Sequence, residues 1–177
     1  TTAERVHRLA AAVEEGTHAA QAVVPQGIRV LRWPFTYRIR SFDEAAEAAA
    51  VEYWTGKYTP QSPETYRRVF GQMREEMAPV QGEERQTWLQ VIRLGDVALV
   101  GVPGELFTRL GMEIRRRSPF RYTYVVGLAN GTIGYIGDRD AYDVGGYQLW
   151  AGWHSMSGPG TGEALVEQAL QMLNEVV

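Results

Sequence analysis

Apolar residues recur at helical spacing in several parts of the chain. In residues 2–24, a stripe of Val6, Leu9, Ala10 and Val13 predicts a helix that is expected to stop at the Pro25-Gln-Gly27 turn. Further helices are predicted for residues 41–53, 62–77, 105–117 and 161–175.

The residues at the start of two of these helices match known capping patterns. Ser41 is followed three residues later by Glu44, which is the spacing of a capping box. Pro63 comes directly after Ser62, and proline fits the first turn of a helix because the N–H it lacks would have no partner there. We therefore expect helices to begin at both serines.

Alternating or continuous apolar runs predict strands between the helices. Residues 28–40 alternate, but Pro34 interrupts them, which is typical of an edge strand or a bulge. Further strands are predicted for residues 85–94, 97–102 and 121–130. The mixture of a hairpin at Gly95-Asp96 with strands separated by helices predicts an α/β or α+β fold, in which helices flank a mixed β-sheet.

Composition excludes some classes of function. The net charge is −3, and the densest basic cluster, Arg115–Arg117, ends a predicted helix, where cations favour the helix dipole. We therefore expect no nucleic-acid partner. No apolar run is long enough to cross a membrane, so the chain is not expected to be transmembrane. The absence of cysteine excludes disulfides and thiolate chemistry, and leaves the compartment undetermined between soluble secreted and cytoplasmic locations.

Glu105 follows the buried strand 97–102 and the pair Pro103-Gly104, at a predicted strand-to-helix junction. One interpretation is that it caps the helix electrostatically. The other is that it points into a crevice at the carboxyl end of the sheet, where open α/β folds bind ligands. The residues alone leave both interpretations open.

Residues 130–160 are rich in Gly, Tyr and Asp and show no clear periodicity, which predicts a long functional loop. Tyr135 and Tyr147 lie within it. Asp138, Asp140 and Asp143 suggest calcium, but their spacing does not match an EF-hand loop.

Two other features of the sequence have the composition of binding sites. The glycine-rich segment 157–163 precedes a helix and is compatible with phosphate binding, but it lacks the lysine of a P-loop. His7 and His18 lie too far apart along one helix to share a metal, and His154 is isolated in the sequence. The residues by themselves form no complete catalytic set.

Three motifs together resemble a known family. "GDVALVGVPGELFTRLG", "NGTIGYIGDRDAYDVGGYQ" and "GPGTGEALVEQAL" are similar to the C-terminal half of the catalytic domain of neutral (non-lysosomal) ceramidases, above all the shorter bacterial members. The resemblance is clear over residues 90–175 and weak over 1–85. These enzymes are zinc amidohydrolases that cleave the N-acyl bond of ceramide.

The resemblance implies roles for three residues. Glu105 matches the glutamate zinc ligand of the V-P-G-E motif, and Tyr135 matches a tyrosine zinc ligand. Tyr147 matches a tyrosine, twelve residues further on, that helps to hold the substrate amide and its developing oxyanion. The metal is expected to be Zn²⁺, and the substrate a ceramide-like lipid or another small amide.

In that family, two histidine ligands, a serine and an arginine come from the preceding half of the domain, and no segment here matches them. The resemblance therefore implies that residues 1–177 are either a single domain or the C-terminal portion of a longer catalytic domain. The partner would be the N-terminal half, in the same protein or in a second chain. The alternative function is a non-catalytic domain of the same fold that binds a ligand or a partner and lacks a complete metal site.

Overall fold

The computed structural model describes residues 1–22, 27–59 and 61–177. The order of its elements is as follows: α1 (Thr2–Ala19), β1 (Ile28–Arg38), α2 (Glu44–Tyr58), α3 (Pro63–Met77), η1 (Ala78–Val80), β2 (Glu84–Leu94), β3 (Val97–Gly101), β4 (Glu105–Leu106), α4 (Thr108–Arg117), β5 (Tyr122–Val126), β6 (Tyr135–Ile136), α5 (Arg139–Val144), η2 (Tyr147–Leu149) and α6 (Thr161–Glu175).

The centre of the fold is a mixed sheet with the strand order β1-β2-β3-β5. The pairs β1–β2 and β2–β3 are antiparallel, and β3 pairs in parallel with β5 through the crossover helix α4. A smaller parallel pair, β4–β6, lies beyond the carboxyl end of β3. This confirms the predicted class of a mixed sheet with flanking helices.

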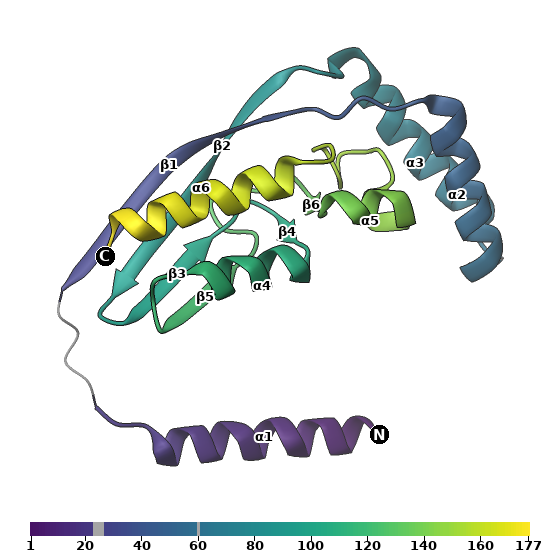
Figure 1. Ribbon diagram of the computed structural model, residues 1–177. Helices are drawn as coiled ribbons and strands as arrows, with labels where there is room; N and C mark the ends of the chain where they lie inside the picture. The colour runs from purple at the N-terminus through teal and green to yellow at the C-terminus, as the bar shows by residue number, and fades with distance from the viewer. Residues whose placement is uncertain (23–26, 60) are drawn as a thin grey trace.

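The helices α4 and α6 cover one face of the sheet (Figure 1). Alternate residues of the strands point into this layer, and Leu89, Val91 and Val100 are fully buried there. From α6, Leu165 and Leu173 pack into the same core. Burial of each such side chain contributes about 1.5–3 kcal/mol, so this layer holds the fold together.

The opposite face of the sheet is apolar and exposed. Ile92 and Leu99 lie side by side in the strand register, flanked by Val30 on β1 and Tyr124 on β5. Val30 is 51% exposed and Tyr124 is 53% exposed. An apolar row that crosses all of the strands is unusual on a solvent-facing surface.

The helix α1 has no buried residue, and it lies apart from the sheet in Figure 1. It ends at Ala19, earlier than the boundary predicted at 24, because Ala20 is already extended. The stop predicted at Pro25 falls on residues outside the described part of the chain. Its apolar stripe is present as predicted, with Leu9 68% exposed.

Several predicted boundaries were wrong. The second helix begins at Glu44 with Asp43 as its cap, because the Asp43 carboxylate rather than Ser41 accepts the N–H of Ala46. The segment 130–160 is not one loop, since it contains β6, α5 and η2. Pro34 was correctly interpreted, because β1 is an edge strand.

Candidate functional site

Glu105 does not lie in the first turn of a helix, so the capping interpretation was wrong. It belongs to β4, and α4 begins only at Thr108. The N–H of Glu105 donates to the carbonyl of Gly134 at 2.9 Å, and the N–H of Phe107 donates to the carbonyl of Ile136 at 3.0 Å. These hydrogen bonds hold Glu105 and Leu106 in an extended conformation, so the helix begins only after them.

Tyr135 is the direct partner of Glu105 in the parallel pair β4–β6. Paired residues of neighbouring strands project from the same face, so the carboxylate and the phenol share one side of this small sheet. Glu105 is exposed and Tyr135 is half-buried. The backbone therefore brings together two residues that are thirty positions apart in the sequence.

Two glycines allow this close pairing. A side chain at Gly104 would collide with the carbonyl of Gly134. Gly134 has a φ of +78°, and a side chain there would collide with the carbonyl of His154. Since only glycine fits both the space and the left-handed backbone, Gly134 fixes where Tyr135 emerges.

Tyr147 completes a cluster with these two residues. Its hydroxyl lies 3.1 Å from the hydroxyl of Tyr135, and the two rings meet edge to face at 5.7 Å. The hydrogen bond to Tyr147, partial desolvation and the negative charge of Glu105 all raise the pKa of Tyr135 above its ordinary value. Without a nearby cation, Tyr135 is therefore held as a neutral phenol.

His154 positions Tyr147 through the backbone. Its Nε2 donates to the carbonyl of Tyr147 at 2.7 Å, which leaves Nδ1 without a proton. Burial lowers the pKa of His154, so the ring stays neutral. Nδ1 is buried without a hydrogen-bond partner, against Gly152. Sequence reasoning missed this role, because an isolated histidine between Trp153 and Ser155 carries no local signal.

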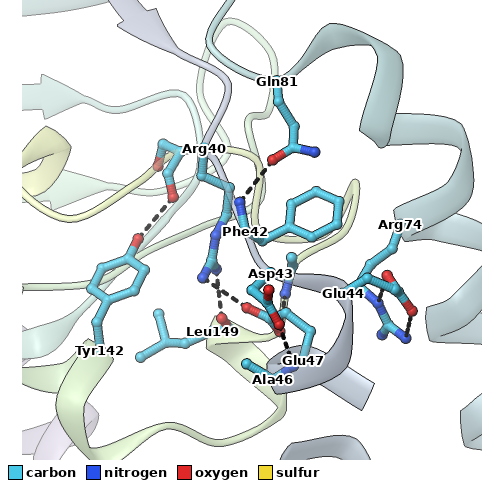
Figure 2. Close-up of polar contacts among 12 residues, drawn as sticks. Arg40, Phe42, Asp43, Glu44, Ala46, Glu47, Arg74, Gln81, Tyr142 and Leu149 are labelled. Atoms are coloured by element: carbon cyan, nitrogen blue, oxygen red, sulfur yellow. Dashed lines mark hydrogen bonds and ion pairs between the residues drawn. The ribbon is translucent and has the colours of Figure 1, made fainter. Parts of the chain in front are cut away.

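A second missed group, Arg40 and Glu47, supports the segment that follows Tyr147 (Figure 2). The Arg40 guanidinium donates to the carbonyl of Leu149 at 2.5 Å and to the Glu47 carboxylate at 3.2 Å. The other oxygen of Glu47 accepts the N–H of Ala151 at 2.9 Å. Both side chains are largely buried, at 10% and 14% exposed, so solvent screens this pair only weakly.

The donor set at the site fits part of a zinc site. Glu105 and Tyr135 offer a carboxylate and a phenol from one face, and both are oxygen ligands that zinc accepts. Within residues 1–22, 27–59 and 61–177, no cluster of three or more His, Cys, Asp or Glu side chains is placed to hold a metal ion. Even if both side chains bound one zinc ion, two of the four ligands that zinc prefers would have to come from elsewhere.

The aspartate group and the glycine-rich segment at the start of α6, which are the other two candidate sites, both make hydrogen bonds within the chain. Asp138 and Asp140 both accept hydrogen bonds from Arg109, at 3.3 and 2.9 Å, so a cation already offsets part of the charge of this acidic group. At the start of α6, the Glu163 carboxylate accepts the N–H of Arg139 at 2.8 Å. The Arg139 guanidinium lies beside Gly160 at the same helix start, so side chains of this chain already occupy the position.

No described helix is both long and apolar enough to pass through a lipid bilayer.

The comparisons with known proteins give limited similarity. No protein-family model matches the chain, and no curated protein matches it. Among solved structures, the chain is similar to the neutral ceramidase from Pseudomonas aeruginosa and to a structure described as a ceramidase complexed with C2. Each match has 26% sequence identity and a TM-score of 0.46, and covers 51% of this chain but only 15% of the ceramidase chain. At this TM-score the matches do not assign the family.

Proposed function

We propose that this chain supplies part of the active site of a zinc-dependent amidohydrolase that is similar to neutral ceramidases. The observation that carries the proposal is the juxtaposition of Glu105, Tyr135 and Tyr147. The first two are paired across neighbouring strands, and the hydroxyl of the third lies 3.1 Å from that of the second. The V-P-G-E and G-Y-I motifs that contain the first two residues also carry the family resemblance.

In this proposal, Glu105 and Tyr135 are zinc ligands and Tyr147 holds the substrate. When bound, Zn²⁺ supplies a Lewis acid for the amide carbonyl and favours ionisation of a ligand phenol. Tyr147 is 48% exposed, so its hydroxyl is accessible to a substrate. It would donate a hydrogen bond to the oxyanion that develops as the amide carbon becomes tetrahedral, a role in which one donor contributes about 3–4 kcal/mol.

The site needs further ligands, which we propose come from a segment equivalent to the N-terminal half of the ceramidase domain. That segment belongs to the same protein or to a second chain. The apolar outer face of the sheet, around Ile92 and Leu99, supports this proposal, because a surface of this kind favours burial against another layer.

The proposal is tested on the protein as isolated from its native source, with any chain that copurifies. Metal analysis is expected to find one zinc per chain, lost in Glu105→Ala and retained in the control Glu175→Gln, which changes an exposed carboxylate at the end of α6. Tyr147→Phe is expected to retain zinc and to lower kcat for an N-acyl amide by about 100- to 1000-fold.

Zinc that persists in Glu105→Ala would contradict the proposed ligand role. A protein that contains no zinc and hydrolyses no amide would instead support the alternative function, a binding domain of the same fold.

A further inference from the structure

An aromatic cavity of about 460 Å³ lies next to the candidate site. It is formed between the helical hairpin α2–α3 and the turn η2 that carries Tyr147. The lining residues are Trp54, Thr55, Tyr58, Thr59, Tyr66, Gly146, Tyr147, Gln148 and Trp150. None of them is charged at neutral pH.

The cavity shares residues with the proposed active site. Tyr147 lines it and also makes the hydrogen bond to Tyr135. Gln148 lines the cavity and, in addition, the open hollow that contains Glu105 and Tyr135. A ligand held at the hydroxyls of the two tyrosines therefore lies beside this apolar space.

The walls of the cavity are lined by aromatic rings that stack on their neighbours. Trp54 and Tyr58 are stacked, with ring centroids 5.4 Å apart and planes 13° from parallel. Tyr66 is stacked on Phe70, with planes 12° from parallel. Aromatic rings bind other rings better than they bind saturated groups of equal size, because edge and face carry complementary partial charges.

These walls are held in place by packing beneath them. Trp150, which is 4% exposed, meets Phe70 edge to face at 4.7 Å and forms a small core with Val51. The wall that Trp150 forms is therefore fixed by the small core of the hairpin.

We infer that this cavity binds an uncharged aromatic ring attached to the amide substrate. The inference rests on the proposed function, since it takes Tyr147 as the residue that holds the amide. It narrows the substrate class to amides with a planar ring on one side of the scissile bond.

The test is equilibrium binding of two matched amides to the full chain. N-benzylacetamide carries a phenyl ring, and N-(cyclohexylmethyl)acetamide carries the saturated ring of equal carbon number. Binding is followed through the indole N–H signals of Trp54 and Trp150 in two-dimensional NMR spectra. We expect both signals to shift with N-benzylacetamide, and this probe to bind about threefold or more tightly than its saturated counterpart.

A matched pair of variants locates the binding. Tyr58, on α2, and Tyr124, on β5, are 63% and 53% exposed, but only Tyr58 lines the cavity. Tyr58→Ala is expected to weaken the binding of N-benzylacetamide by about threefold or more, and Tyr124→Ala to leave it unchanged. Equal affinity for the two amides, or equal loss in the two variants, would overturn the inference.

The measurements separate this inference from the proposed function, because they require neither zinc nor turnover. If the protein binds the ring but contains no zinc and hydrolyses no amide, the proposed function is contradicted and the inference about the ring is not. Hydrolysis that depends on Glu105 but is equally fast for the two amides contradicts only the inference about the ring.

Discussion

Glu105 and Tyr135 are fixed through the backbone of two paired strands, whereas Tyr147 is fixed by side chains from distant elements. The first two emerge from β4 and β6, beside the glycines at 104 and 134. The third depends on His154, Arg40 and Glu47. The positions of Glu105 and Tyr135 are therefore set by backbone pairing, whereas Tyr147 can move if the hairpin that carries Glu47 moves.

Gly134→Ala tests the part of the site that is held by the pairing of β4 and β6, and it is expected to have the largest effect on stability. The added methyl group collides with the carbonyl of His154 at a residue with a φ of +78°. We expect the free energy of unfolding to fall by about 3 kcal/mol or more, measured by denaturant titration. The control Gly71→Ala adds a methyl group within α3, where nothing lies within 4 Å, and should be neutral or stabilising. Similar stability in both variants would show that the pairing of β4 and β6 is not constrained at Gly134.

Arg40→Met tests the part of the site around Tyr147, which is held by side chains. It leaves the largely buried Glu47 carboxylate without its cation and removes the bond to the Leu149 carbonyl. We expect a loss of about 2–3 kcal/mol in the free energy of unfolding, with a shift of the Trp150 indole signal as η2 moves. Arg68→Met, on the exposed surface of α3, is the matched control and should change stability by less than about 0.5 kcal/mol. An unchanged Trp150 signal in Arg40→Met would contradict the bracing role.

Glu44→Gln tests an ion pair between the two helices of the hairpin α2–α3, and its expected effect on the free energy of unfolding is smaller. Glu44 accepts two hydrogen bonds from Arg74, whose side chain is only 4% exposed, and this pairing lowers the pKa of Glu44 (Figure 2). Because Glu44 itself is 62% exposed, solvent screens the pair, and we expect a loss of about 1 kcal/mol at pH 7.

The dependence of this loss on pH follows from the direction of the pKa shift. A lowered pKa in the folded state stabilises the protein above the ordinary carboxyl pKa of about 4.5, and the contribution disappears as the pH falls through the lowered value. Thermal unfolding of the wild type and of Glu44→Gln should therefore converge in that acidic range. Glu75→Gln, beside Arg74 on the exposed side of α3, should follow the wild type at every pH. A difference that persists in strong acid would argue against the ion pair as its source.

The sequence predicted the sheet and its helices because apolar periodicity reports burial directly. The strand at 85–94 and the helix at 161–175 were predicted nearly to the residue. The predicted start of α4 was wrong. The strand β4 has only two residues, which are too few to show a periodic pattern in the sequence. Its existence depends on a partner strand thirty positions away, which no local pattern encodes.

The family resemblance selected Glu105, Tyr135 and Tyr147, and the structure brings these three residues together. Sequence reasoning missed the supporting residues, because Arg40 and Glu47 bind backbone atoms more than 100 positions away and His154 binds a carbonyl in an irregular segment. The aromatic cavity had a weak signal, since Trp54 and Tyr58 are one helical turn apart. That spacing identifies a shared helix face but not the turn at Tyr147 that closes the other side.

The position of Pro34 limits the ways in which copies of this chain can associate. Pro34 is in the middle of the edge strand β1, where it offers no N–H to an added strand, and its carbonyl already accepts a hydrogen bond from Gln168 at 2.9 Å. Growth of the sheet by strand addition along β1, the usual route to edge-to-edge aggregation, is therefore interrupted at its midpoint. A partner that binds next to β1 is therefore expected to contact the apolar face of the sheet rather than its edge.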